Sequence, residues 1–322
     1  MSEVKQSEKQ PGLVILTGPT AVGKTDLSIA LAKRIGGEII SADSMQVYRH
    51  MDIGSAKIMP DEMDGIPHHL IDVLEPTEEF NVVSFQQMAK QAMDGIYGRG
   101  HIPIVTGGTG FYIQALLYDI NFTDNDEDTA LRRQLEEIAK TQGNEVLYDR
   151  LKCIDPESCE IIHPNNVKRI IRAIEFYEKT GMKISEHNII QRQNSSPYNF
   201  AYFVLNDDRD KLYRGIEKRV DTMMEQGLVD EVQRLADSGC TRDMVSMQGL
   251  GYKEILDYLD GRINLEEAVY LIKRDTRHFA KRQLTWFRRE RDTVIIDKPD
   301  FSYDNDRILD YIITVLQGKG IV

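Results

Sequence analysis

The amino-acid sequence predicts an α/β fold, with a parallel sheet covered by helices and an all-helical subdomain inserted into it. Short apolar runs at 13–17, 38–42 and 102–106 alternate with amphipathic helical patterns. This order is typical of a parallel sheet whose ligands lie at the carboxyl ends of its strands. Residues 123–197 then contain helical patterns without a strand, and a β-rich run follows at 200–205. The helical stretch is therefore predicted to be an insertion into the α/β core rather than a second domain in tandem.

The first loop of this core matches the pattern G-x-x-x-x-G-K-[ST], which is typical of phosphate-binding loops. It consists of Gly18, Pro19, Thr20, Ala21, Val22, Gly23, Lys24 and Thr25. An apolar run precedes it and a helical pattern at 26–34 follows it, so backbone N–H groups and a helix N-terminus point at an anion. In this arrangement Lys24 reaches the outer phosphate and the Thr25 hydroxyl holds Mg²⁺. The core is expected to resemble that of P-loop NTPases.

Composition narrows the class of protein. The chain has 322 residues, of which 41 % are hydrophobic and 29 % charged, as in ordinary globular proteins. We expect a flexible polar tail at 1–11, a core formed by 12–122 and 198–322, and the insertion at 123–197. The tail has no apolar signal-peptide core, no stretch approaches membrane-spanning length, and the three cysteines match no zinc spacing. We therefore expect a cytoplasmic protein without a membrane partner.

The remaining elements are predicted from apolar periodicity. A helix from Ser84 to about residue 97 opens with a capping-box pattern. Helices of the insertion are expected at 128–140, 145–151, 156–161, 166–179 and 183–191. After the strand at 200–205, we expect helices at 209–238, 252–259 and 265–289, a strand at 293–297 and a last helix at 305–317.

An aspartate, Asp43, follows the second predicted strand. A carboxylate beside a phosphate loop has three interpretations, namely a Mg²⁺ ligand, a general base or an N-cap for the next segment. The third strand ends in the glycine-rich run 107–110 and lacks the strand-end Asp that holds Mg²⁺ in hydrolysing P-loop enzymes. The bound phosphate is therefore predicted to be a leaving group. We expect the glycines to let the backbone approach a ligand closely.

Positive side chains are unevenly distributed, although the net charge is −12. One cluster lies at 168–172, and another contains Lys273, Arg274, Arg277, Lys281, Arg282, Arg288, Arg289 and Arg291. Such clusters form either solvated surfaces or a local nucleic-acid site. Arg219, on a predicted helix, is a candidate to neutralise the phosphate. His68 and His69 would point to opposite faces of an extended segment, which argues against a shared metal ion.

Seven blocks of sequence, taken together, resemble one family. They are 18–25, 41–48, 51–57, 67–72, 107–112, 163–166 and 281–287. In this order they resemble bacterial tRNA dimethylallyltransferases, also called tRNA isopentenyltransferases, and the resemblance covers about residues 12–289. It implies transfer of a dimethylallyl group from dimethylallyl diphosphate to N6 of the tRNA adenosine 3′-adjacent to the anticodon, with release of pyrophosphate.

The resemblance also implies roles for single residues. Asp43 would accept the N6 proton, and Lys24, Arg219 and Thr25 with Mg²⁺ would neutralise the pyrophosphate. Thr20 and Thr109 would contact the reacting end of the donor. Contacts with the target base, the anticodon stem and the RNA channel fall to Asp43, Ser44, Met45, Gln46, Thr109, Arg132, Lys168, Arg169, Ile170, Ile171, Arg172, Gln248, Lys281, Arg282 and Gln283. The implied partners are tRNA and dimethylallyl diphosphate, the implied cofactor is Mg²⁺, and we expect a monomer.

Two departures from the family pattern and three alternatives remain. Gly215 stands where many members carry Arg, and Met247-Gln248 lacks a basic residue that some members have. The alternatives are an adenylate isopentenyltransferase of cytokinin type, a P-loop small-molecule kinase and a nucleotide-gated RNA-binding protein. The helical insertion and the late basic helix favour tRNA over a free nucleotide. The sequence leaves open which tRNAs are modified and whether ATP binds the loop.

Overall fold

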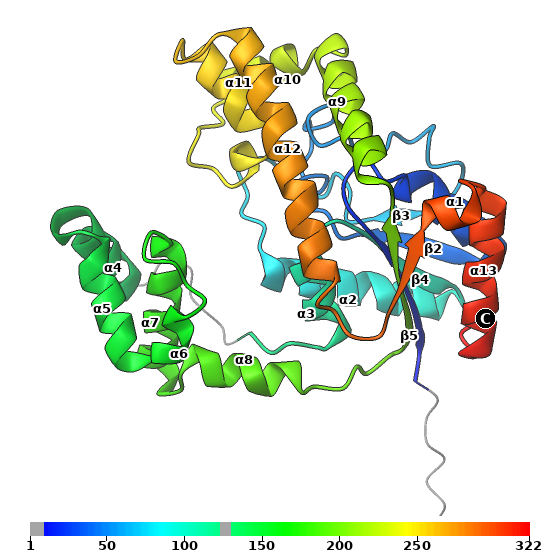
Figure 1. Ribbon diagram of the computed structural model, residues 1–322, viewed down its shortest axis with the longest axis horizontal. Helices are drawn as coiled ribbons and strands as arrows, with labels where there is room; N and C mark the ends of the chain where they lie inside the picture. Colours follow the sequence, from blue (N-terminus) through cyan, green and yellow to red (C-terminus); the bar gives the residue numbers. More distant parts are fainter. Residues whose placement is uncertain (1–9, 123–129) are drawn as a thin grey trace, which may run out of the picture. The chain divides into compact units, whose positions relative to one another are not determined.

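A computed structural model describes residues 10–122 and 130–322 of the chain. The chain separates into two compact units. One combines the residues up to Leu117 with Pro197–Val322, and the other is Tyr118–Ser196 (Figure 1). The first unit contains the sheet and the second contains only helices among its described residues.

The boundary of the predicted tail needs a correction. Residues 1–9 lie outside the described residues, but the carbonyl oxygen of Pro11 accepts a hydrogen bond from the Asn199 N–H at 3.0 Å. Pro11 is therefore already fixed against the sheet, and the first strand begins at Gly12. The predicted start of the inserted helices, at 123–129, also lies outside the described residues.

All six strands are parallel, which confirms the predicted α/β fold with a parallel sheet. The strands are β1 (Gly12–Thr17), β2 (Gly37–Ser41), β3 (His68–His69), β4 (Ile102–Gly107), β5 (Asn199–Asn206) and β6 (Thr293–Asp297), in the order β3-β2-β4-β1-β5-β6. Sequence analysis missed β3, since two histidines carry no apolar pattern. The carboxyl ends of β1, β2 and β4 share one edge of the sheet, where the phosphate loop, Asp43 and the glycine-rich loop begin.

Helices cover both faces of the sheet. Figure 1 shows α1 and α13 on one side and α2, α3 and α12 on the other. The helices of this unit are α1 (Lys24–Ile35), α2 (Val82–Gly98), α3 (Gly110–Leu117), α9 (Arg209–Glu225), α10 (Leu228–Asp237), α11 (Tyr252–Leu259), α12 (Leu265–Phe287) and α13 (Asn305–Gly318). Two short 3₁₀ turns, η1 (Ser246–Gln248) and η2 (Lys298–Phe301), complete it. Fully buried side chains of β1 and β5, such as Leu16 and Phe203, pack against α1 and α13 in the core.

Two helix predictions were wrong in detail. The helix expected at 209–238 is two helices, because Gly227 has a left-handed backbone (φ 95°) between α9 and α10. The cap of α2 is Asn81 rather than Ser84, since the Asn81 side chain accepts hydrogen bonds from the N–H groups of Val83 and Ser84. Every helix among the described residues is too short or too polar to span a membrane.

The helical unit has its own core. It contains α4 (Ala130–Gln142), α5 (Asn144–Ile154), α6 (Pro156–Cys159), α7 (Val167–Thr180) and α8 (Ile184–Arg192). Leu135, Leu151 and Ile170 are fully buried between α4, α5 and α7. The amphipathic periodicity therefore placed these helices correctly to within a few residues, because each has one apolar stripe to bury.

Candidate active site

The phosphate loop connects β1 to α1 and has the backbone of an anion-binding nest. Gly23 precedes α1 with a left-handed backbone (φ 88°), and Ala21 adopts a positive φ of 63°. A Cβ atom on Gly18 would lie only 2.5 Å from the Leu205 carbonyl oxygen, so only glycine fits there. The positive φ angles of Ala21 and Gly23 and the amino end of α1 suit this loop to an anion, because negative charge is favoured at a helix N-terminus.

Lys24 folds back over this loop. Its Nζ donates hydrogen bonds to the carbonyl oxygens of Gly18 at 3.0 Å and Pro19 at 2.8 Å. Burial and the charge of Arg219 lower the pKa of Lys24 to about 7, and the charge of Asp43 partly opposes that shift. A bound diphosphate would supply the counter-charge and favour the protonated form of Lys24.

Arg219 reaches the same loop from α9. Its Nη1 donates a hydrogen bond to the Thr20 hydroxyl at 3.2 Å. Burial lowers the pKa of Arg219, and the Asp43 carboxylate counteracts this effect. The structure thus brings together Thr20, Lys24, Arg219 and Asp43, which sequence analysis had taken from separate segments.

Asp43 lies just beyond the end of β2, with its two oxygens in different environments. Oδ1 accepts hydrogen bonds from the N–H groups of Met45 at 2.8 Å and Gln46 at 3.4 Å. This is the capping role that the sequence left open. Oδ2 makes no hydrogen bond to the described part of the chain and remains able to accept a proton. One carboxylate can therefore serve as both a turn cap and a base.

The residues after Asp43 are largely engaged within their own loop. The Gln46 amide accepts from the Ser41 hydroxyl at 3.2 Å and donates to the Ala56 carbonyl oxygen at 3.2 Å. Ser44 and Met45 are half-buried. The structure therefore places Ser44, Met45 and Gln46 beside Asp43, with the Gln46 amide already holding the loop.

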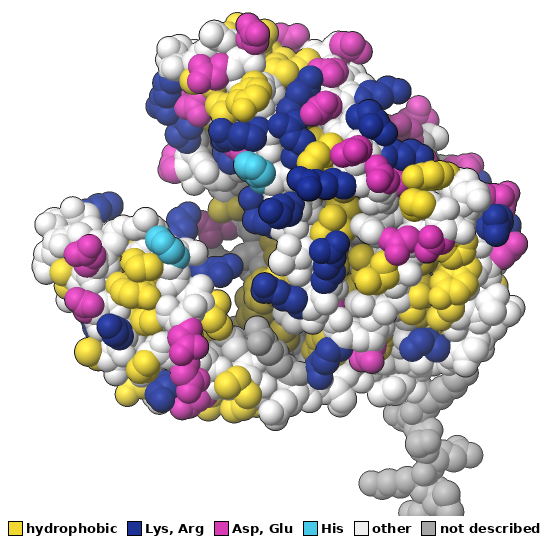
Figure 2. All heavy atoms as spheres, viewed as in Figure 1, with side chains coloured by type: hydrophobic (Ala, Val, Ile, Leu, Met, Phe, Trp, Pro, Cys, Tyr) yellow, Lys and Arg dark blue, Asp and Glu magenta, His cyan; other side chains and the backbone are white. Residues whose placement is uncertain are grey.

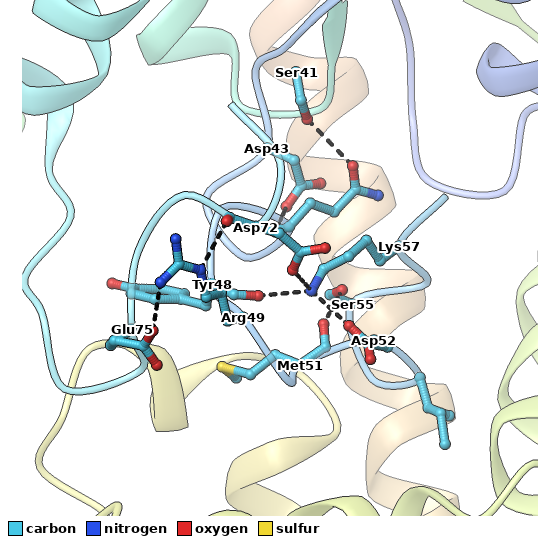
Figure 3. Close-up of polar contacts among 12 residues, drawn as sticks. Ser41, Asp43, Tyr48, Arg49, Met51, Asp52, Ser55, Lys57, Asp72 and Glu75 are labelled. Carbon is cyan, nitrogen blue, oxygen red and sulfur yellow. Dashed lines mark hydrogen bonds and ion pairs between the residues drawn. The ribbon is translucent and has the colours of Figure 1, made fainter. Parts of the chain in front are cut away.

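A buried lysine supports this loop and was missed as a functional candidate. Only 1 % of the Lys57 side chain is exposed, and its Nζ donates to the Tyr48 carbonyl oxygen at 2.7 Å and to Asp52 at 2.6 Å. A third bond goes to the Asp72 carboxylate, as Figure 3 shows. Lys57 thus ties three segments of the 43–75 loop together.

Glu231 of α10 holds the same loop from outside. Its buried carboxylate accepts hydrogen bonds from the N–H groups of Asp52, Ile53 and Gly54 at 2.8–3.0 Å, and from the Tyr252 hydroxyl at 2.8 Å. No local pattern signals this residue, because its three backbone partners are 177–179 positions away in sequence.

The glycine-rich loop at the end of β4 accommodates protein rather than a ligand. A Cβ atom on Gly107 would overlap the Ala42 backbone. On Gly108 it would overlap the Gln283 amide, and on Gly110 the Trp286 ring. The expectation that these glycines make room for a ligand is therefore corrected. Between them, the Thr109 N–H donates to the Ala42 carbonyl oxygen at 3.2 Å, so Thr109 lies next to the segment that carries Asp43.

Gln283, expected to contact RNA, points into the protein. Its side chain lies between the phosphate loop and the glycine-rich loop, and the residue is only 5 % exposed. Its Oε1 accepts a hydrogen bond from the Thr20 N–H at 2.9 Å, and its Nε2 donates to the Gly108 carbonyl oxygen at 3.0 Å. The neighbouring Lys281 and Arg282 are exposed. The Gln283 side chain is thus engaged by the protein itself, and its contact with RNA stays a prediction.

The basic cluster of α12 is partly neutralised. Ion pairs join Lys273 to Asp221, Arg277 to Glu217 and Arg274 to Asp275. Figure 2 shows Lys and Arg side chains gathered along the surface where α12 runs in Figure 1, with acidic side chains among them. Gln248, another predicted RNA contact, is exposed and donates its amide to the Arg242 carbonyl oxygen.

The basic cluster of the helical unit also needs a correction. Ile170 and Ile171 are 0 % and 4 % exposed and belong to the core of that unit, so their side chains cannot contact RNA. Arg132 pairs with the buried Glu175 at 2.7 Å. Burial and the neighbouring Arg132 lower the pKa of Arg172, which is half-buried. Lys168 and Arg169 are exposed at the start of α7.

A second lysine at the phosphate loop was missed entirely. Lys298, the first residue of η2 after β6, donates from Nζ to the Val22 carbonyl oxygen at 3.1 Å. This bond fixes the outward-facing side of the Val22–Gly23 peptide, whose N–H belongs to the nest. Thr25, by contrast, is exposed in the first turn of α1.

Comparison with known proteins places this geometry in context. A family model described as IPP transferase matches residues 46–290, and one described as isopentenyl transferase matches 11–75. A tRNA dimethylallyltransferase from Lachnoclostridium phytofermentans is 61 % identical over 310 residues, which is 96 % of this chain and 99 % of that protein.

Solved structures agree with these matches. The full-length tRNA isopentenylpyrophosphate transferase of Bacillus halodurans is 46 % identical, with a TM-score of 0.72 over 97 % of this chain and 98 % of that one. The corresponding transferase of Staphylococcus epidermidis is 41 % identical, with a TM-score of 0.71 over 96 % and 99 %. A eukaryotic dimethylallyltransferase acting on tRNA is 31 % identical, with a TM-score of 0.78 over 91 % of this chain and 75 % of that one. The chain belongs to the IPP transferase family.

Proposed function

We propose that this protein transfers a dimethylallyl group from dimethylallyl diphosphate to N6 of the tRNA adenosine 3′-adjacent to the anticodon. The observation that carries the proposal is the pairing of a phosphate nest with a free carboxylate oxygen on Asp43. The nest has Lys24 and Arg219 at its mouth, whereas β4 ends in Gly107 and provides no hydrolytic Asp. These groups suit a diphosphate that departs from carbon.

The reaction forms one bond and breaks one. The adenine N6 lone pair attacks C1 of the donor, while the bond between C1 and the diphosphate oxygen breaks and its electrons leave with pyrophosphate. The N6 proton passes to Asp43 Oδ2. Lys24, Arg219 and the loop N–H groups neutralise the pyrophosphate, as donors preorganised for developing charge do. Thr20 and Thr109 flank the reacting end of the donor.

Magnesium fits the residues present. Mg²⁺ prefers oxygen ligands and is commonly held by one or two protein groups together with phosphate oxygens. The exposed Thr25 hydroxyl in the first turn of α1 is such a group. When bound there, Mg²⁺ would add positive charge at the departing diphosphate.

The acceptor base must leave the anticodon loop to reach a pocket at the end of a strand. Ser44, Met45 and Gln46 follow Asp43 in the loop beside this pocket and are the candidates to contact the extruded base. Lys168, Arg169, Lys281 and Arg282 are exposed cations suited to the phosphate backbone, which dominates such affinities. Action as a monomer in the cytoplasm is part of the same proposal.

The test is product analysis with isotopically labelled dimethylallyl diphosphate and unmodified tRNA. We expect label in the RNA and N6-isopentenyladenosine after nuclease digestion. Label on free AMP alone would favour an adenylate isopentenyltransferase. Loss of the γ-phosphate of ATP without prenyl transfer would favour a kinase. The Asp43→Asn variant serves as the matched control and should label the RNA about 10²- to 10⁴-fold more slowly.

A further inference from the structure

We propose that Gln283 is a positioning residue that fixes the phosphate loop relative to the glycine-rich loop. This inference rests on the proposed function, because Thr20 and Thr109, on the two loops, are the residues assigned to the reacting end of the donor. Gln283 touches neither substrate in this account. It acts through the backbone of Thr20 and Gly108.

The Gln283 amide is used at both ends, and its orientation is fixed. The oxygen accepts from the Thr20 N–H at 2.9 Å, while the nitrogen donates to the Gly108 carbonyl oxygen at 3.0 Å. A flipped amide would set donor against donor and acceptor against acceptor. Asn is one methylene shorter, and Glu has no hydrogen to give to the Gly108 carbonyl. Among common side chains, this pair of bonds therefore requires glutamine.

The two hydrogen bonds of Gln283, to Thr20 and Gly108, form a clasp that changes which backbone groups of the phosphate loop can bind an anion. Because the Thr20 N–H is committed to Gln283, the backbone donors left for a diphosphate begin at Ala21. Thr20 is held a second time through its hydroxyl, which accepts from Arg219 of α9. Two helices, α9 and α12, thus fix the same loop residue. A buried bond network of this kind holds a loop in one conformation before a ligand arrives.

Substitution of Gly108 tests the same contact without changing Gln283. A Cβ atom there would overlap the Gln283 Nε2, yet the Gly108 backbone is not in the left-handed region that favours glycine. Alanine at 108 would therefore displace the amide without backbone strain. One turn further along α12, the Trp286 ring covers Gly110 in the same way. Gly108 and Gly110 therefore leave room for side chains of α12.

The experiment separates binding of pyrophosphate from binding of RNA. Gln283→Met, close in size but unable to make either bond, and Gly108→Ala are compared with Arg282→Gln, the adjacent exposed position of α12. We expect both clasp variants to weaken pyrophosphate binding about tenfold, as for one lost buried hydrogen bond. The donor KM should rise and kcat should fall, while tRNA affinity changes less than about twofold, within the range of a neutral surface change. Arg282→Gln should do the reverse, lowering tRNA affinity alone.

Two outcomes would overturn the inference. The first is a Gln283→Met protein, folded by its thermal transition, that binds pyrophosphate like the wild type. The second is loss of tRNA affinity with unchanged donor KM, which would make Gln283 an RNA contact. Should Gln283→Met not fold, Gly108→Ala decides the matter by the same readouts. Pyrophosphate binding requires no prenyl transfer, so a wild type without transferase activity would refute the proposed function and leave this test intact.

Discussion

The guanidinium of Arg219 donates to the Thr20 hydroxyl across 3.2 Å, so α9 meets the phosphate loop at a residue that we propose to contact the donor. Arg219 therefore does more than add charge, because it also fixes the rotamer of Thr20. The charge of Arg219 lowers the preference of Lys24 for its protonated form, and an anion bound beside both groups would relieve this effect.

Replacing Arg219 by Gln should therefore lower kcat/KM for the donor by about 100- to 1,000-fold, the loss typical of removing one preorganised charge-stabilising donor. Lys218→Gln removes the same charge from the exposed neighbouring position and serves as the control. Steady-state rates with varied dimethylallyl diphosphate measure the effect. Equal losses for the two variants would mean that Arg219 contributes only long-range charge.

The Asp43→Asn variant separates the proposed role of Asp43 as a general base from its role as a turn cap. The Asn oxygen can still accept from the Met45 N–H, so the turn should persist, but the side chain can no longer take a proton. We expect kcat to fall by about 10²- to 10⁴-fold, as for loss of a general base. Pyrophosphate affinity, measured by calorimetry, should stay close to that of the wild type. Near-normal turnover would assign Asp43 to the cap alone.

Exposed cations of the helical unit should make the affinity for RNA depend on salt concentration. Lys168→Ala combined with Arg169→Ala removes two candidate phosphate contacts. The slope of log K against log salt concentration should become shallower by about 1.4–1.8, since each contact contributes roughly 0.7–0.9. Lys140→Ala with Lys179→Ala changes the net charge equally at the ends of α4 and α7 and is the control. Identical slopes for the two double variants would remove Lys168 and Arg169 from the interface.

Local sequence signals predicted the parts of the site that are contiguous in the chain. The phosphate loop is one run of eight residues between an apolar strand and a helix. All of the residues that identify it are therefore adjacent in the sequence. Asp43 was found because a strand-end position has a known meaning in parallel sheets. The helical unit was predictable because each helix has its own apolar stripe.

Long-range contacts were invisible to the same reasoning. Gln283 and Lys298 join the phosphate loop across 263 and 276 positions, and no periodicity encodes such a partner. The glycines at 108 and 110 were read as space for a ligand, because sequence shows that a Cβ is excluded but not what excludes it. Ile170 and Ile171 were counted with their charged neighbours, although a helix turns adjacent residues to different sides.

Gly215 offers a test of a position where the resemblance leads us to expect Arg. It lies in α9 beside Ala21, and a Cβ there would be 3.7 Å from the nearest atom, an ordinary contact. Gly215→Ala should therefore raise the free energy of unfolding by about 0.5–1 kcal/mol, as for glycine in a helix interior. Gly215→Arg should in addition bind pyrophosphate more tightly than Gly215→Ala in titration calorimetry. Equal affinity would show that charge at this position does not reach the nest.

The carboxylate of Glu38 should make the stability of the fold depend on pH in the acid range. Its carboxylate, 2 % exposed, accepts from Arg99 at 2.7 and 2.8 Å and contacts His69 and His101 at 2.7 Å, which ties β2 to β3 and to the start of β4.

The Arg99 hydrogen bonds, against the effect of burial, lower the pKa of Glu38 to about 2. Because the pKa of Glu38 is lower in the folded state, its ionised carboxylate stabilises the fold above the unfolded pKa of about 4.5. This stabilisation is lost as the pH falls toward 2. Glu38→Gln should therefore destabilise the fold by about 1–2 kcal/mol at pH 7, a loss reduced by the solvent exposure of Arg99. Denaturant titrations should show this difference shrinking between pH 4.5 and 2, and a difference independent of pH would refute the role of Glu38 ionisation.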